Sequence, residues 1–166
     1  IALRYAYRAA ELAPGNPEAQ LAPAITLGKM LPLANGSAEK LASSRGIKSS
    51  ADKTIALDSK NDTAWHVLGR WHRGVAEIKG VKRMFGGLAF GKLPKSTYEN
   101  AAACLERAIA LNPKRPMHYI ELGCLYQAMG KKAEAKTYLE RGLAMAETDK
   151  DDPTTKARGR QILRSL

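Results

Sequence analysis

A tract rich in cations, residues 79–95, contains the residue types that point most directly to binding chemistry. It has five basic residues and no acidic one, and it holds the only two phenylalanines of the chain. Cations attract an acidic protein or an anionic lipid surface, and aromatic side chains anchor such a contact by burial. The residues expected to make these contacts are Lys79, Lys82, Arg83, Phe85, Phe90, Lys92 and Lys95. The alternative is that the phenylalanines pack back on the fold while the cations are only solvated.

A second set of candidate ligands, His66, Arg70 and Arg73, follows a spacing of four and three residues. Residues at this spacing lie on one face of a helix. Their side chains could grip a carboxylate or a phosphate through charge-assisted hydrogen bonds. The alternative is a solvated stripe that pairs with Glu77 or Asp62.

The motifs that would indicate catalysis are incomplete. Residues 86–92 nearly match the phosphate-binding pattern G-x-x-x-x-G-K-[ST], but Leu93 replaces the hydroxyl residue that would bind magnesium, and no strand precedes the tract. The three histidines show no metal-ligand spacing, and no nucleophilic triad has a recognisable context. We therefore expect a protein that is not an enzyme, with no cofactor and no metal site.

The elements that would position these residues form an internal repeat. Residues 9–14, 54–59 and 108–113 are three similar helix endings, and each is followed by a polar turn. A new helix then opens at Pro17, Asp62 or Pro116, which are residue types that favour a first helical turn. The repeating unit is therefore two helices and a turn.

These units resemble the tetratricopeptide repeat (TPR), whose first helix follows a Trp-x2-Leu-Gly-x2-Tyr pattern. The matching residues are Trp65, Leu68, Gly69 and His72 in one unit, and Tyr119, Leu122, Gly123 and Tyr126 in the next. Small residues let antiparallel helices approach closely, and stacked pairs bury a shared core. The sequence predicts an all-α, TPR-like α-solenoid of stacked antiparallel helix pairs, with about three repeats.

The spacing of the repeats predicts one domain over residues 1–166 with two inter-helix insertions. We expect the second helix of a truncated leading repeat at 1–14 and a C-terminal capping helix at 153–166. The repeats between them are 17–61 with a short insertion near 31–39, 62–115 with a long basic insertion near 75–95, and the regular repeat 116–149.

The concave groove of such a solenoid is lined by fixed positions of each first helix. The predicted groove residues are His66, Arg70, Arg73, Lys29, Met117, Ile120 and Gln127. This mixture of cations and apolar side chains suits a partner helix or an acyl chain better than a purely ionic tail.

Composition restricts the partners and the location. The 166 residues carry 27 Lys and Arg against 16 Asp and Glu, a formal net charge of +11, which favours polyanionic partners. Nucleic acid is disfavoured because the repeats lack regular base-reading side chains. No apolar run reaches the roughly 18 residues of a membrane span. Two cysteines, Cys104 and Cys124, fit a reducing compartment, cytoplasmic or organelle-associated. The chain opens on Ile1 inside a helical pattern, which leaves room for a targeting segment before it.

The order of the insertions resembles the TPR domain of the regulator of microtubule dynamics family over most of residues 17–147. The similar segments are 24–29, 46–48, 53–57, 68–71, 96–101 and 105–108. The resemblance implies an adaptor, with members linked to microtubules and others to organelle membranes, where they bind lipid and partner proteins. We hypothesise an adaptor for an acidic or amphipathic protein segment, with tubulin as one candidate. The alternative is a module that binds an anionic membrane surface or phospholipid.

Overall fold

All regular structure in the described residues is helical, which confirms the predicted all-α solenoid. A computed structural model of the chain describes residues 1–34, 36–85 and 96–166, and only the backbone of residues 37 and 79–85. The helices are α1 Ala2–Leu12, α2 Pro17–Met30, the 3-10 helix η1 Leu31–Leu33, α3 Ser37–Leu57, α4 Asp62–Phe85, α5 Tyr98–Leu111, α6 Pro116–Ala128, α7 Lys132–Ala144 and α8 Asp152–Arg164. In this described part, no helix combines the length and the hydropathy required to span a membrane.

Short polar motifs fix where the helices begin. The side chain of Asn16 accepts hydrogen bonds from the amides of Glu18 and Ala19, and Pro17 occupies the first helical turn of α2. Thr97 caps α5 in the same way, because its hydroxyl accepts from the amide of Asn100. The helix starts expected near Pro17 and Pro116 lie at those residues.

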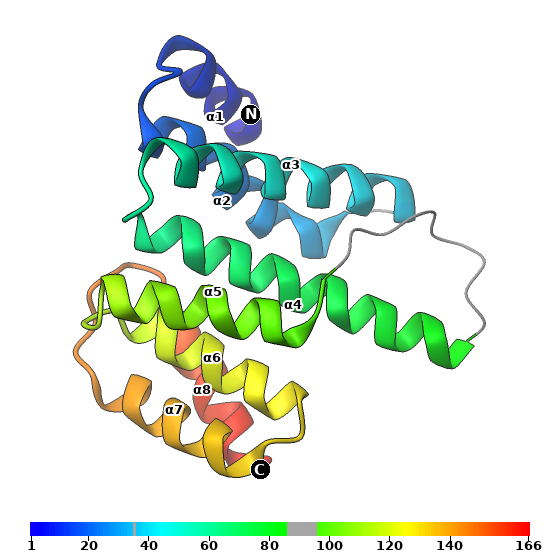
Figure 1. Cartoon of the computed structure of the whole chain (residues 1–166), viewed down its shortest axis with the longest axis vertical. Helices are drawn as coiled ribbons and strands as arrows, with labels where there is room; N and C mark the ends of the chain where they lie inside the picture. The colour runs from blue at the N-terminus through cyan, green and yellow to red at the C-terminus, as the bar shows by residue number, and fades with distance from the viewer. Residues whose placement is uncertain (35, 86–95) are drawn as a thin grey trace.

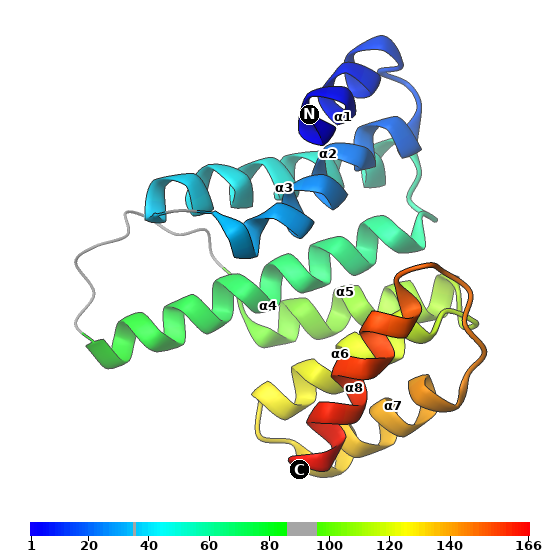
Figure 2. The ribbon, with the colours of Figure 1, turned by 180° about the vertical axis from the view of Figure 1, so that it is seen from behind.

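The helices stack as antiparallel pairs in two layers. The pairs α2–α3, α4–α5 and α6–α7 lie one on the next, with α1 at one end of the stack and α7 and α8 at the other (Figure 1). Seen from behind, α2, α4 and α6 form the near layer, and α8 lies across α6 on that layer (Figure 2). We call this side, formed by α2, α4 and α6, the inner face.

The core runs along the stack between the two layers. Its largest cluster joins four helices, α2 to α5, through Leu21, Ala24, Leu27, Ile47, Ala51, Ala64, Leu68, Trp71, Val75 and Cys104. Close helix contacts depend on glycine at two matching positions. A Cβ at Gly69 would lie 2.7 Å from Cγ of Leu105, and a Cβ at Gly123 would lie 2.7 Å from Cγ of Leu139. These glycines are the small first-helix residues of the TPR pattern.

Both predicted insertions contain helical residues in the structure. The long insertion was expected between two helices, near residues 75–95. This expectation is wrong for residues 75–85, because α4 continues as a helix to Phe85 and projects past the start of α5 (Figure 1). Mostly helix-forming residues follow Gly74, and Arg73 pairs with Glu77 one turn on, at 3.3 Å. The short insertion near 31–39 contains η1, and α3 already begins at its end, after Gly36 with φ of 89°.

Candidate functional site

A buried carboxylate, Glu121 of α6, gathers three arginines on the inner face. Arg73 of α4 places Nη1 2.7 Å from Oε1 of Glu121, and Arg158 of α8 donates from Nη2 to Oε2 at 2.5 Å. Arg70 of α4 brings Nε to 3.6 Å from Oε2. Burial alone raises the pKa of Glu121, but Arg73, Arg70 and Arg158 outweigh it and hold this pKa at about 2. Glu121 is therefore ionised, and its ion pairs connect α6 to α4 and α8.

A second polar network lies beside Glu121 and joins α4 to α6. Nε2 of His118 lies 2.8 Å from Oδ2 of Asp62, and Nδ1 of His118 lies 3.0 Å from Nδ1 of His66. Arg115 donates to the same Oδ2 of Asp62 at 3.1 Å and to Oδ2 of Asp149 at 3.1 Å. Burial raises the pKa of Asp62, but His118 and Arg115 lower it to about 2. Burial also lowers the pKa of His66, which therefore packs as a neutral ring.

Helix α8 covers part of the inner face. Ile120 of α6 is fully buried in a cluster with Ile162 and Leu163 of α8. A Cβ at Gly159 would lie 3.1 Å from Cγ2 of Ile120, so the two helices are in close contact. At the start of α8, Asp151 also accepts from Nζ of Lys29 on α2 at 2.8 Å. Helix α8 therefore occupies the part of the predicted groove that α6, the first helix of the third repeat, would line.

The predicted groove residues do not form one accessible surface. His66 is only 3% exposed and Ile120 is fully buried, so neither is available to a partner. The side chain of Arg73 is 19% exposed and belongs to the Glu121 cluster. Arg70 and Lys29 remain about half exposed, but each already has an acidic neighbour. Of the remaining two, Gln127 is exposed and Met117 is partly buried; their binding role stays a prediction.

The basic insertion is described only in part. The backbones of Lys79, Lys82, Arg83 and Phe85 lie in the last turns of α4. Phe90, Lys92 and Lys95 lie outside the described residues. The expected contacts of this tract with lipid or protein therefore stay predictions.

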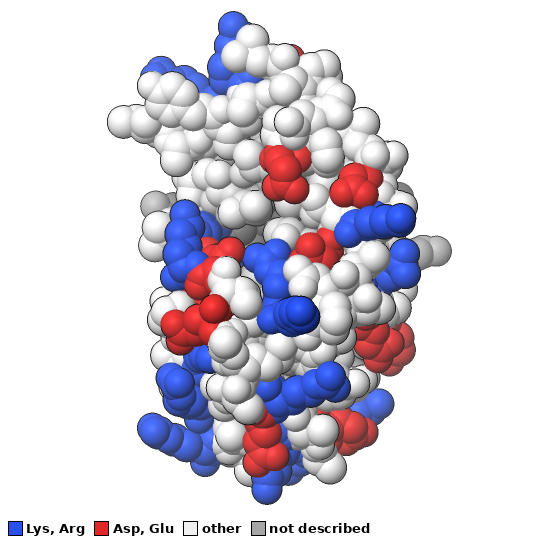
Figure 3. Space-filling model, turned by 90° about the vertical axis from the view of Figure 1, so that its left-hand side faces the viewer, with Lys and Arg blue, Asp and Glu red and all other residues white. Residues whose placement is uncertain are grey.

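Basic and acidic side chains are mixed on one side of the molecule (Figure 3). On the side of the molecule drawn in Figure 3, basic and acidic side chains alternate over the middle and lower parts. Among the described residues, no three His, Cys, Asp or Glu side chains are placed to hold a metal ion. Both cysteines are free and buried, and burial raises the pKa of Cys104 to about 11. Such thiols are poor nucleophiles at neutral pH.

Glu121 and Arg158 are the residues of this cluster that the sequence analysis missed. One signal was present: Glu121 is the one charged residue in the apolar run 119–125, where a buried acid needs a cationic partner. The spacing of Arg70 and Arg73 indicated their shared helix face correctly. The acid that they face lies 48 residues or more along the chain, beyond the reach of helix spacing.

Two comparisons with known proteins agree with this structure. The family model "Regulator of microtubule dynamics protein 1-3" matches residues 1–166. Regulator of microtubule dynamics protein 1 of Bos taurus is 29% identical over 166 residues, which are 99% of this chain and 52% of the relative. The Homo sapiens protein of the same name is 28% identical over 128 residues, 76% of this chain and 41% of the relative. The chain thus spans about half of the length of these relatives.

Solved structures support the fold independently. A thermophilic TPR protein of Thermus thermophilus superimposes with a TM-score of 0.68 at 16% identity, over 96% of this chain and 72% of the other. The protein MamA superimposes with a TM-score of 0.56 at 19% identity, over 98% of this chain and 78% of the other. At these identities the likeness concerns the fold alone. Together with the family match over its whole length, these findings establish that the chain is TPR-like and belongs to the regulator of microtubule dynamics family.

Proposed function

We propose that this chain is a non-enzymatic TPR adaptor that binds an acidic protein segment, such as one presented by the surface of a microtubule. TPR solenoids provide extended surfaces for protein partners. The relatives are named as regulators of microtubule dynamics, and tubulin presents an acidic surface. The observation that carries the proposal is the excess of 27 basic over 16 acidic residues on this frame.

The distribution of ion pairs strengthens this argument. Several acids are used inside the fold: Glu121 by three arginines, and Asp62 and Asp149 by Arg115. Cations elsewhere remain exposed and have no acidic partner among the described residues. Examples are Arg45, Lys53, Arg107 and Lys114. These internal pairs use four arginines against three acids, so the rest of the chain still carries a formal net charge of about +10 out of the total of +11.

Reversing the charge of Arg73 would be a poor test of this function. Arg73 lies 2.7 Å from the buried Glu121, so a glutamate at this position would place two carboxylates together in the interior. Loss of binding would then report unfolding. Binding must therefore be tested with the folded, unaltered chain or with substitutions of exposed residues.

The test is sedimentation of the purified chain with stabilised microtubules, intact or with their acidic C-terminal tails removed by limited proteolysis. We expect binding to intact microtubules that weakens with added salt, and much weaker binding when the tails are absent. Equal sedimentation with both kinds of microtubule, or none with either, would overturn the proposal.

Flotation with anionic vesicles separates the membrane alternative from this function. That alternative depends on Phe85 and Phe90, whose side chains lie outside the described part of the structure. Salt-sensitive flotation that is lost on replacing both residues by serine, without any binding to microtubules, would favour the membrane module.

A further inference from the structure

We propose that a hollow between α3 and α4 binds carboxylate side chains of an acidic protein segment. This inference deepens the proposed function and rests on it, because it assigns acid binding to particular residues. The hollow has a volume of about 360 Å³ and is open to solvent. It is lined by Arg45, Lys48, Ser49, Asp52, Lys53 and Trp71. We call these six residues the α3 hollow.

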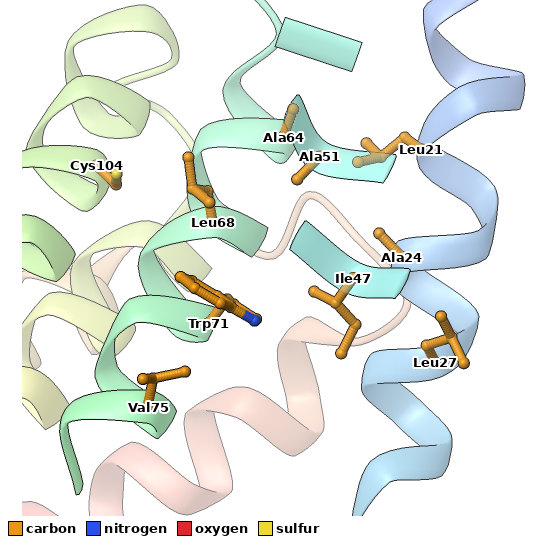
Figure 4. Close-up of a cluster of buried hydrophobic side chains, with 10 residues drawn as sticks. All are labelled: Leu21, Ala24, Leu27, Ile47, Ala51, Ala64, Leu68, Trp71, Val75 and Cys104. Carbon is orange, nitrogen blue, oxygen red and sulfur yellow. The ribbon is translucent and has the colours of Figure 1, made fainter. Parts of the chain in front are cut away.

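The α3 hollow is built by helix spacing and one aromatic ring. Its five α3 residues follow the pattern i, i+3, i+4, i+7 and i+8, counted from Arg45, and so lie on one face of the helix. Trp71 reaches from α4 toward Ile47 of α3 (Figure 4). Its Nε1 donates to the carbonyl oxygen of Ser44 at 2.8 Å and to the Ser44 hydroxyl at 2.9 Å. With its ring held in this way and only 6% of the residue exposed, Trp71 forms a rigid floor.

The charge of the α3 hollow favours an anion. Three cationic side chains line it against one carboxylate. Lys48 is held in place, with Nζ 5.6 Å from the ring centroid of Trp71 and 2.6 Å from Oδ2 of Asp52. Arg45 and Lys53 are exposed and have no acidic partner among the described residues. Because Arg45 and Lys53 are separated by about 12 Å along α3, two carboxylates of one segment would supply this missing charge, each accepting hydrogen bonds from one cation.

The surroundings of these cations favour a peptide over a small free anion. The aliphatic stems of Arg45, Lys48 and Lys53 provide apolar surface beside the charged groups, above the nearly buried ring of Trp71. An acidic segment that carries an apolar side chain would use both kinds of surface at once. The volume is near the lower end for ligand pockets and suits a few side chains. On the inner face, the two arginines of α4 whose side chains the structure describes, Arg70 and Arg73, already face Glu121.

The probe is a fluorescently labelled oligoglutamate peptide with one central leucine, and its glutamine counterpart measures the contribution of charge. Binding to the complete chain is followed by fluorescence anisotropy. The test variant carries Arg45→Glu and Lys53→Glu, and the matched control carries Arg107→Glu and Lys114→Glu. All four residues are exposed, and each double variant lowers the net charge from +11 to +7, because each reversal removes two charges. Circular dichroism confirms that both variants are folded.

We expect the variant in the α3 hollow to bind the glutamate peptide about 100-fold more weakly, roughly tenfold for each lost charge-assisted contact. The control should weaken binding less than about threefold, as general screening of a distant charge requires. Asp52→Asn should instead tighten binding about threefold, because it removes a competing carboxylate and releases Lys48. A purely structural role of these residues would not produce that gain.

Equal loss in the two double variants would overturn the α3 hollow as a site and would show diffuse charge attraction instead. Equal affinity for the glutamate and glutamine peptides would overturn it as well. The function is judged separately, by sedimentation with microtubules. If sedimentation survives in the variant of the α3 hollow, the site is wrong and the adaptor function stands; if the unaltered chain does not sediment, the function itself fails.

Discussion

Replacing Glu121 by glutamine tests whether the buried ion cluster holds the solenoid together. Each tenfold change in proton affinity corresponds to about 1.4 kcal/mol. Lowering the pKa of Glu121 from 4.5 to about 2 therefore corresponds to about 3 kcal/mol in favour of the folded, ionised state. This agrees in size with the roughly 3–5 kcal/mol that is lost when one partner of a buried ion pair is removed. We expect Glu121→Gln to lower the free energy of unfolding at pH 7 by about 3 kcal/mol.

The dependence on pH gives this prediction its sign. Because the pKa of Glu121 is lower in the folded state, its stabilisation is complete above about pH 4.5 and is lost as the pH falls toward 2. The difference in stability between the natural chain and Glu121→Gln should therefore narrow to less than half by about pH 3. If Glu121 acted only through the shape of its side chain, the difference in stability between the two proteins would not change with pH.

The assay is urea unfolding followed by circular dichroism at several pH values, with Glu140→Gln as the control. Glu140 is 55% exposed and lies 3.9 Å from Lys136, so its loss should cost less than about 1 kcal/mol. In thermal unfolding, Glu121→Gln should lower the midpoint by about 6–12 °C. A Glu121→Gln protein as stable as the control, or a difference that does not change with pH, would refute the role given to the cluster.

Three further predictions concern the core. Gly123→Ala should destabilise the fold by about 1–3 kcal/mol, because the added Cβ would overlap Leu139 of α7. Gly74→Ala should instead stabilise the fold by up to about 1 kcal/mol, because an added Cβ there would meet no atom within 4 Å. Thermal unfolding measures both changes. Cys104 and Cys124 should resist iodoacetamide at pH 8 until urea unfolds the chain, as read by mass spectrometry, and rapid labelling of the native protein would contradict their burial. Because burial lowers the pKa of His66 below 6.5, stability should fall as the pH drops below about 6.5, and His66→Gln should remove part of that dependence in urea unfolding.

The helix pairs were predictable because their signals act over short distances. Proline and asparagine at helix starts, and small residues such as Gly69 and Gly123 at close contacts, have the same effect wherever the pair lies. The long insertion was predicted as a connection because repeat length alone cannot distinguish a loop from three more helical turns. The run of mostly helix-forming residues after Gly74 was the overlooked signal.

The candidate site was harder to predict because its contacts join distant parts of the chain. Arg158 of α8 reaches Glu121 across 37 residues, and Lys29 reaches Asp151 across 122. Helix periodicity assigns a residue to a face but does not say which later element covers that face. For this reason His66 and Ile120 were predicted as groove residues although other helices bury them. The α3 hollow was missed for the same reason, since its floor, Trp71, comes from the next helix.

The most direct test of the account is an amide NMR map of the chain titrated with the oligoglutamate peptide. Acid binding at the α3 hollow predicts shifts in the indole N–H of Trp71 and in the amides of residues 45–53, with little change around Glu121. Shifts confined to Arg70 and its neighbours on the inner face would contradict this assignment and return the binding site to the groove.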